Sequence, residues 1–334
     1  MRFRHVMEVD IPQALARLAP TLGGTGVEAV QRLSGGASME TWAFTLTGAA
    51  GPREMILRRR SGPFDEATAR STSLATEAAL ISAAAKVGAP VAPLIRLCEP
   101  DDGLGEAHIT ARIGGEALGR KIVTDPRFEA VRPRLARQCG QILAQIHAAS
   151  ADGIPLKRSD AAEELDRYEE VYRQSGAQRP ILQLAFQHLR KHTPRPVADV
   201  LLHGDFRNGN LMISPDTGVA AVLDWELSHL GDPAEDLGWL CVNSWRFGRS
   251  DRPVGGFGDY GDLLAGYAQA GGVPVDLSRL RYWQALGSLK WGVMCLMMYS
   301  SYAAGAESSV ERPMIGRRVS ETEIDLVNLL EAGL

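Results

Sequence analysis

Lysine is scarce in this chain. Only five of the 36 basic residues are lysines, at positions 86, 121, 157, 191 and 290, so nearly all the positive side chains are arginine. The 40 acidic residues leave a formal net charge of −4. This balance predicts neither a nucleic-acid partner nor an anionic membrane partner, because both need a basic surface.

Cysteine is also rare, and its four copies are far apart in the sequence. Cys98, Cys139, Cys241 and Cys295 form no CxxC pair, so the sequence predicts neither a disulfide framework nor a zinc site. Free cysteines are typical of a reducing compartment, and we expect a cytoplasmic protein. The first twenty residues have no continuous apolar run of the kind a signal peptide needs.

Long apolar runs are missing as well. The most hydrophobic stretch is "ALGSLKWGVMCLMMYSSYAA" (285–304), and Lys290 and several small polar residues interrupt it. A membrane span needs about 18 or more consecutive apolar residues. The helical spacing of its leucines instead predicts a buried or groove-lining helix.

Length and hydrophobic content are what the chain does have. Its 334 residues, 45% of them apolar, exceed the roughly 100–200 residues of a typical domain. We therefore expect two lobes, an N-terminal one over 1–112 and a C-terminal one over 113–334.

The first lobe is predicted to be rich in strands. A helix over 73–88 begins at a Ser/Thr cluster and ends at Gly88, with Pro90 just beyond. Short apolar segments bounded by turn residues predict five strands around it, over 29–35, 39–46, 53–60, 93–99 and 107–113. Three strands, one helix and two strands form a small α+β lobe.

The second lobe is predicted to be mainly helical. Amphipathic patterns cover 128–150, much of 160–192 and most of the chain after 259. The exception is 200–225, where two apolar segments flank the turn "SPDTG" and predict a hairpin.

The densest polar cluster of the sequence lies on this hairpin, in "LLHGDFRNGNLMI" (201–213). Asp205 and Asn210 stand there, and Asp224 follows at the far end of the second strand. A hairpin brings its ends together, so Asn210 and Asp224 can meet and offer oxygen ligands to Mg²⁺. Asp205 lies one loop away, where it can take a proton from a hydroxyl. This division of labour is typical of phosphoryl transfer. Asn208 has no predicted role.

Three segments, "HGDFRNGN", "LDWE" and "GDPAEDLGW", occur in an order and spacing that resemble the aminoglycoside phosphotransferase family. These enzymes are small-molecule relatives of protein kinases, and the nearest branch is the kinase-like domains attached to some acyl-CoA dehydrogenases. The resemblance covers about residues 25 to 300. It implies a bilobal, protein-kinase-like α+β fold. In that fold a five-stranded antiparallel sheet with one helix precedes a helical lobe with a small catalytic hairpin.

The resemblance also implies roles for single residues. Asp205 would be the catalytic base, and Asn210 and Asp224 would be the Mg²⁺ ligands. Asp236 would brace the catalytic loop. His203 would help to hold the loop, although a lone histidine is more often a structural residue than a catalyst.

On the nucleotide side, the loop over the phosphates would be "LSGGASMETW", with Gly35, Gly36 and Ser38 approaching the ligand. It lacks the G-x-G-x-x-G pattern of protein kinases. The connector "ITARIGGE" would meet the adenine with backbone groups near Ala111 and Ile113; the alternative is a plain interdomain strand.

Arg58 stands where a kinase-like strand presents a lysine to the phosphates, and Glu77 follows at the spacing of the kinase ion pair. Arginine keeps the charge but is planar and longer than lysine. Two outcomes are open, an enzyme that uses arginine or a weakened nucleotide site.

The acceptor is predicted to be a small molecule, because no activation segment ending in A-P-E follows Asp224. The aromatic candidates for its pocket are Trp245, Tyr282, Trp283 and Trp291, although core packing is the commoner fate of such residues. Arginines and Lys290 in the same segments favour a neutral or anionic hydroxyl compound.

The sequence thus predicts a kinase that uses Mg²⁺ and moves the γ-phosphoryl group of ATP or GTP to a small-molecule hydroxyl. One alternative is a nucleotide-binding pseudokinase or regulatory module. Another is a metal-dependent hydrolase with a site built from His203, Asp205, Asp224 and His229; it leaves Asn210 and the first lobe unexplained.

Overall fold

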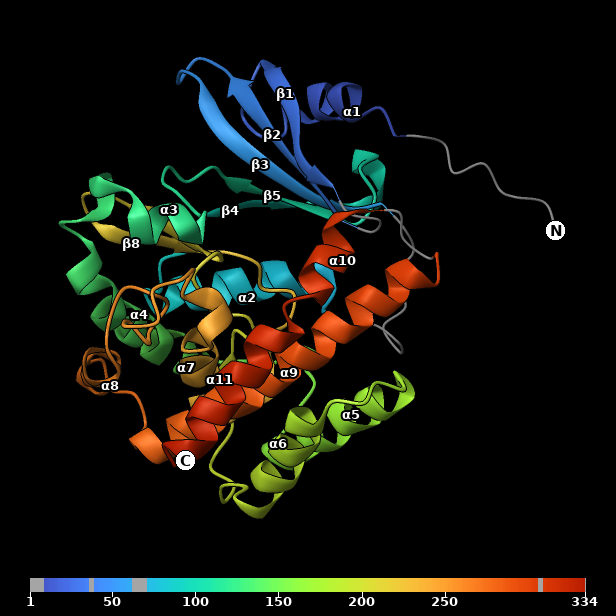
Figure 1. Cartoon of the computed structure of the whole chain (residues 1–334). Coiled ribbons are helices and arrows are strands. Elements are labelled where there is room, and N and C mark those ends of the chain that lie inside the picture. Colours follow the sequence, from blue (N-terminus) through green and yellow to red (C-terminus); the bar gives the residue numbers. More distant parts are fainter. Residues whose placement is uncertain (1–8, 36–38, 62–70, 306–308, 334) are drawn as a thin grey trace.

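The computed structural model describes residues 9–35, 39–61, 71–305 and 309–333. The first part of the chain folds into one antiparallel sheet with the strand order β1-β2-β3-β5-β4 (Figure 1). Its strands are β1 (Gly26–Gly35), β2 (Met39–Thr47), β3 (Arg53–Arg60), β4 (Leu94–Leu97) and β5 (Ala107–Ala111).

One face of this sheet is covered by α1 (Ile11–Leu18), a helix that the sequence did not predict. Asp10 caps it by accepting a hydrogen bond from the Gln13 N–H at 3.0 Å. Ile11 and Leu15 are buried against strand residues such as Phe44 and Leu57. This apolar layer includes Met55 and Leu57 of β3, the strand that carries Arg58.

The link to the helical part runs through α2 (Leu74–Lys86), which contacts β4 and β5. Ser73 caps α2 by accepting a hydrogen bond from the Thr76 N–H. Glu77 lies in the first turn of α2 and is buried.

The rest of the chain is mainly helical (Figure 1). Its α-helices are α3 (Gly119–Thr124), α4 (Arg132–His147), α5 (Ala161–Gln174), α6 (Pro180–Lys191), α7 (Ala234–Leu240), α8 (Tyr260–Gln269), α9 (Leu277–Ala303), α10 (Glu311–Gly316) and α11 (Val319–Glu331). The 3-10 turns are η1 (Pro100–Asp102), η2 (Pro126–Phe128) and η3 (Asn243–Trp245). The long α9 contacts α5, α6, α7, α10 and α11, and one buried cluster forms around it, whereas another forms around α4 and α8.

Four short strands interrupt the helices and form two ribbons. β7 (Leu211–Ser214) pairs with β8 (Gly218–Val222), and β6 (Val200–Leu202) pairs with β9 (His229–Gly231). The predicted hairpin is therefore β7–β8, whereas the "VLL" segment before the polar loop pairs with a later strand.

The β7–β8 hairpin is also bonded to segments next to the first sheet. Ile213 on β7 and Glu116 exchange two backbone hydrogen bonds of 2.9 Å. Val222 on β8 donates to the Pro90 carbonyl at 2.8 Å.

The observed architecture confirms the predicted fold class. The predicted five strands and the helix over 73–88 occur in the predicted order, each within a few residues of its expected bounds. Among the described helices, none is long and apolar enough to cross a membrane.

Candidate active site

Asp205 stands at the start of the loop that joins β6 to β7, and its carboxylate is held on both oxygens. Oδ1 accepts hydrogen bonds from the indole Nε1 of Trp239 at 2.7 Å and from Nε of Arg207 at 3.0 Å. Oδ2 accepts one from the amide Nδ2 of Asn210 at 2.7 Å. Donors on both oxygens give the carboxylate one fixed orientation.

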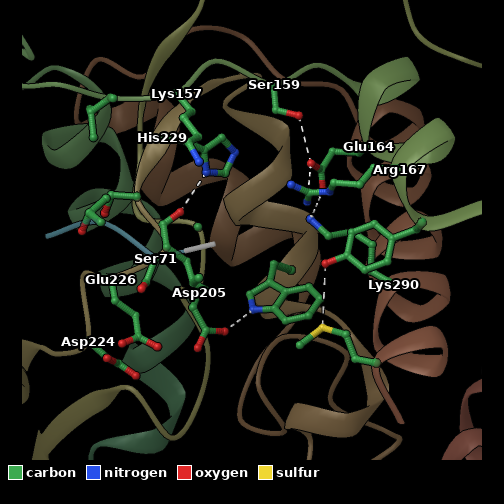
Figure 2. A pocket seen from close by; sticks show the side chains of 18 of the residues that line it. Ser71, Lys157, Ser159, Glu164, Arg167, Asp205, Asp224, Glu226, His229 and Lys290 are labelled. Carbon is green, nitrogen blue, oxygen red and sulfur yellow. Dashed lines mark hydrogen bonds and ion pairs between the residues drawn. The ribbon is translucent and has the colours of Figure 1, made fainter. Parts of the chain in front are cut away.

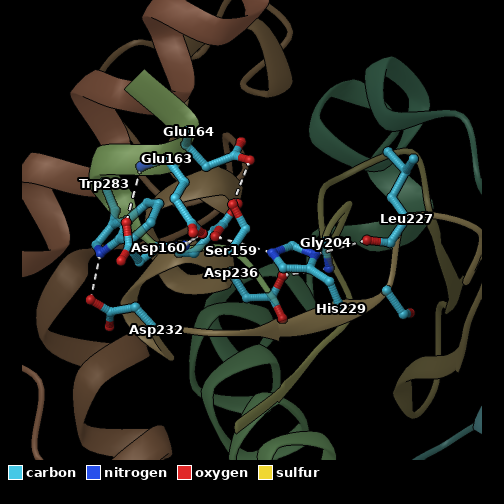
Figure 3. Close-up of polar contacts among 12 residues, drawn as sticks. Ser159, Asp160, Glu163, Glu164, Gly204, Leu227, His229, Asp232, Asp236 and Trp283 are labelled. Carbon is cyan, nitrogen blue, oxygen red and sulfur yellow. Dashed lines mark hydrogen bonds and ion pairs between the residues drawn. The ribbon is translucent and has the colours of Figure 1, made fainter. Parts of the chain in front are cut away.

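The backbone before Asp205 is held by the buried carboxylate of Asp236. Its oxygens accept the N–H groups of His203 at 2.8 Å and Gly204 at 2.9 Å. Figure 3 shows Asp236 facing the Gly204 segment. Burial opposes the charge, yet hydrogen bonds from His147 and from the His203 backbone lower the pKa of Asp236. A charged group thus anchors this loop.

His203 is fully buried, and both its ring nitrogens bind backbone. Nε2 lies 3.0 Å from the carbonyl oxygen of Leu223, and Nδ1 accepts the Asp205 N–H at 3.2 Å. Burial lowers the pKa of this imidazole, so it is neutral with its proton on Nε2. His203 ties the polar loop to the residue after β8, and its side chain is fully buried.

Asn208 acquires a structural role. Its buried amide donates from Nδ2 to the Gly255 carbonyl at 2.7 Å. This bond ties the loop to the tight turn at 254–258, where Val254 and Gly258 form a bridge.

Asn210 and Asp224 lie where the hairpin brings its ends together. The Leu223 N–H donates to the Asn210 carbonyl at 2.8 Å. Asp224 has a φ of 68°, a left-handed conformation that Asp adopts more readily than most residues. Because Nδ2 of Asn210 points to Asp205, its side-chain oxygen faces away from that carboxylate.

Arg58 on β3 meets three carboxylates. Nε lies 3.1 Å from Glu77, and one terminal nitrogen lies 2.8 Å from Asp224 and 2.8 Å from Glu226. The predicted Arg58–Glu77 pair therefore exists. Arg58 also reaches the hairpin end, which the sequence did not predict.

The Arg58 cluster, defined as Arg58, Glu77, Asp224 and Glu226, has three acids for one base. Burial and the charge of Asp224 raise the pKa of Glu226. Burial raises the pKa of Glu77 to about 8 although Arg58 opposes the shift. Both shifts arise because one guanidinium does not compensate three acids at low solvent access.

A cavity of about 670 Å³ opens beside Asp205. Its lining includes Asp205, Arg207, Asp224 and Glu226, and the opposite wall comes from α5, α7 and α9. Figure 2 shows Asp224, Glu226 and Asp205 on one side and Glu164, Arg167 and Lys290 on the other. Aromatic and sulfur side chains complete it: Tyr168, Trp239, Trp245, Trp291, Met294 and Met298.

Charged side chains alternate beside the cavity in what we call the charge chain, His229–Glu235–Lys290–Glu164–Arg167, in which Arg167 is exposed. The Lys290 ammonium lies 3.0 Å from Glu235 and 2.7 Å from Glu164. Glu235 also pairs with His229, and Glu164 with Arg167. Glu235 overcomes the effect of burial and raises the pKa of His229 to about 9, so this histidine is charged at neutral pH.

Of the four aromatic residues proposed for the acceptor pocket, Trp245 and Trp291 line this cavity. Tyr282 and Trp283 do not belong to its lining. Both are buried. Trp283 donates its indole N–H at 2.7 Å to Asp232, which does not line the cavity either.

The predicted nucleotide residues are only partly visible. Gly36 and Ser38 lie outside the described residues, and Gly35 ends β1 opposite Glu40. The Ala111 N–H donates to the Pro93 carbonyl at 2.9 Å, and Ile113 follows the end of β5.

The residues considered for a hydrolase metal site do not gather. Within the described part of the chain, no three His, Cys, Asp or Glu side chains are placed to hold one metal ion. His229 instead directs Nδ1 to the Leu227 carbonyl and Nε2 to Glu235.

Sequence reasoning missed three residues around Asp205: Arg207, Glu226 and Trp239. Each stands within a quoted motif, two residues after Asp205, two after Asp224 and three after Asp236. Their closeness in sequence to these three aspartates was the only sign that they belong to the site, since their partners come from other parts of the fold.

Residues 29–273 match the phosphotransferase enzyme family, which is well over half of the chain. The chain belongs to this phosphotransferase family. Membership confirms the predicted family and the prediction of a kinase-like enzyme.

The phosphotransferase is similar to acyl-CoA dehydrogenase family member 10 of Mus musculus. The two are 29% identical over 201 residues, which are 57% of this chain and 18% of the mouse protein. This chain therefore spans less than a fifth of that relative's length.

Solved structures show the same fold. A Ralstonia eutropha JMP134 protein classed with the aminoglycoside phosphotransferases gives a TM-score of 0.72 at 20% identity, covering 96% of this chain and 98% of that one. An amicoumacin kinase gives 0.58 at 16% identity, covering 94% of each chain. This likeness confirms the predicted kinase-like fold.

Proposed function

We propose that this phosphotransferase moves the γ-phosphoryl group of ATP or GTP to a hydroxyl of a small molecule. The observation that carries the proposal is that Asp205 and Asp224 line one cavity while Asn210 holds the Asp205 carboxylate at 2.7 Å. The amicoumacin kinase of the same fold was solved with AMP-PNP and Ca²⁺.

Asp205 is the base in this proposal. It accepts the proton of the acceptor hydroxyl while the hydroxyl oxygen bonds to the γ-phosphorus and the nucleoside diphosphate leaves. The carboxylate lines the cavity with its side chain 13% exposed, so an acceptor can reach it. Trp239, Arg207 and Asn210 keep it in place.

Mg²⁺ fits the donor set at the hairpin end. Asn210 and Asp224 offer an amide oxygen and a carboxylate, which are hard ligands that suit this ion when substrate phosphates complete its shell. The Arg58 cluster has a surplus of acids, so a divalent cation there is electrostatically favourable. When bound, the ion would neutralise charge on the transferred phosphoryl group.

Arg58 replaces the usual lysine in this proposal. Glu77 holds it from α2, as a kinase glutamate holds its lysine. A guanidinium can keep this pair and still direct a second N–H to a phosphate oxygen. In this structure that second arm contacts Asp224 and Glu226.

The acceptor in this proposal is a neutral or anionic hydroxyl compound with an apolar part. The cavity walls combine tryptophan and methionine side chains with the charge chain, which has one more cation than it has carboxylates. A polycationic acceptor is disfavoured by that surplus of positive charge.

One observation supports the pseudokinase alternative. Arg58 forms an ion pair with Asp224, which is a proposed metal ligand. Two substitutions separate the alternatives. Asp205→Ala should lower turnover by about 10²–10⁴-fold, the usual contribution of a general base, and leave Mg-ATP binding intact. Asp224→Ala should weaken Mg-ATP binding itself.

The measurements are thermal shift with Mg-ATP and Mg-GTP, and nucleotide hydrolysis with and without a metabolite pool. Asp216→Ala serves as the control, because Asp216 is an exposed residue of the same hairpin's turn. Ordinary turnover in Asp205→Ala would overturn the proposed base. Nucleotide binding without any turnover in the wild type would establish the pseudokinase.

A further inference from the structure

The helix α7 touches the catalytic loop at two points, one turn apart. Asp236 accepts the backbone N–H groups of His203 and Gly204. Trp239, three residues later, donates its indole N–H to the Asp205 carboxylate at 2.7 Å. Residues three apart lie on the same face of a helix, so one face of α7 holds both the backbone and the side chain of the proposed base.

The indole of Trp239 is itself fixed. It is 8% exposed, and its ring centroid lies 5.3 Å from that of Trp245. The Lys290 ammonium of the charge chain lies 5.8 Å from the ring centroid, within the range of a cation–π contact. A residue packed on these sides does not change rotamer without moving its neighbours.

The position of α7 is fixed as well, through Gly238. A Cβ at this residue would come within 2.8 Å of the α9 backbone at Trp283 and Gln284. The two helices therefore pack backbone to backbone, and the long α9 sets where Trp239 points.

Trp239 belongs to a cluster of three tryptophans that differ in the use of their indole N–H groups. Trp239, Trp245 and Trp291 pack side by side. Among the residues the structure describes, the buried indole nitrogens of Trp245 and Trp291 have no hydrogen-bond partner. Only the Trp239 nitrogen is used, and it is used on Asp205.

We propose that Trp239 is a positioning residue for phosphoryl transfer, which sets the orientation of the Asp205 carboxylate toward the acceptor. The inference rests on the proposed function. Asn210 holds Oδ2 and Arg207 bonds both oxygens, and these two residues belong to the same loop as Asp205. Trp239 holds Oδ1 from α7, outside that loop. Loss of the Trp239 bond leaves the carboxylate held only by residues that move with its own loop, which widens its range of orientations, lowers the rate and leaves nucleotide binding unchanged.

Trp239→Phe tests this, because phenylalanine keeps much of the ring and removes the N–H. The expected result is a fall in kcat for Mg-ATP turnover of about 10- to 100-fold, the usual effect of losing a group that orients a site. The dissociation constant for Mg-ATP should stay the same.

The chain offers a matched control in Trp283→Phe. Trp283 also donates its indole N–H to a carboxylate at 2.7 Å, that of Asp232, and it is buried outside the cavity lining. Both variants should lose thermal stability, whereas only Trp239→Phe should lose kcat. Equal kcat in the two variants would overturn the inference.

A second measurement does not need turnover. The indole N–H signal of Trp239, assigned by its loss in Trp239→Phe, should shift in the NMR spectrum of Asp205→Ala, while the Trp283 signal stays in place. An unmoved Trp239 signal would overturn the inference directly. The signal could shift in Asp205→Ala although the wild type shows no Asp205-dependent turnover. That result would overturn the proposed function, and with it the positioning role.

Discussion

The two sides of Asp205 carry opposite electrostatic surpluses. On the nucleotide side, the Arg58 cluster has three acids and one base. On the acceptor side, the charge chain has three cations, His229, Lys290 and Arg167, and only the carboxylates Glu164 and Glu235. The base therefore lies between a site that lacks positive charge and a wall that has it in excess.

The difference shows what each side needs from outside the chain. Around Arg58, burial and neighbouring acids raise the pKa values of Glu77 and Glu226. The positive charge of Arg58 is therefore not enough to balance the carboxylates around it. In the charge chain the ion pairs lower the pKa of Glu235 and raise that of Lys290 against the effect of burial. Each carboxylate of the charge chain is paired with cations of this chain, whereas the Arg58 cluster would be stabilised by an added cation.

Substitution of Lys290 is expected to have the largest effect, because it removes the central cation of the charge chain. Lys290→Met would leave Glu164 and Glu235 buried without their shared cation, and we expect a loss of about 3–5 kcal/mol in the free energy of unfolding. Denaturant unfolding measures it, with Lys191→Met, an exposed lysine at the end of α6, as the control. A loss no greater than the control's would mean that the charge chain is not a stabilising unit.

The charge chain also predicts a pH dependence through His229. Its folded pKa of about 9 lies above the ordinary histidine value of about 6.5. Its contribution to stability should be complete below pH 6.5 and disappear as the pH rises through 9, by about 3 kcal/mol in all. The stability difference between wild type and His229→Gln isolates this contribution from other titrating groups. A difference that stays constant from pH 6 to 10 would contradict the assignment.

The smallest expected effect is the stabilisation of the nucleotide side by free Mg²⁺. Because that side has surplus acids, free Mg²⁺ without nucleotide should stabilise the protein, by about 1.4 kcal/mol at ten times its Kd. Thermal unfolding in MgCl2, compared with NaCl of equal ionic strength, measures it. Asp224→Asn should reduce the shift, and an undiminished shift in that variant would place the ion elsewhere.

Much of the fold could be predicted from the sequence because its signals are local. The helix α2 has its cap at Ser73, and β3 has its alternating apolar residues at Met55 and Leu57. The polar spacing of "HGDFRNGN" likewise places Asp205 and Asn210 on one loop. The roles proposed for Asp205, Asn210 and Asp224 stay predictions until the variants are measured.

The rest depends on contacts between distant segments. Nothing near Arg58 in the sequence indicates that it reaches Asp224 and Glu226, some 166 positions later. Tyr282 and Trp283 look like Trp291 in sequence, yet only Trp291 turns toward the cavity, because one helix offers different faces to different partners. The helix α1 went unpredicted although Asp10 and Pro12 mark its start.

The backbone bonds of the β7–β8 hairpin have a mechanical consequence. Glu116 and Pro90 bond the hairpin strands to the segments beside the sheet, whereas Asp205 is fastened to α7. The hairpin also packs on α4, because Leu211, Ile213 and Val222 belong to the same buried cluster as Leu135 and Leu143, so Asp224 is tied both to the segments beside the sheet and to the helices. Any displacement of the sheet relative to the helices would therefore act on this hairpin, and with it on the position of Asp224 relative to the Asp205 carboxylate.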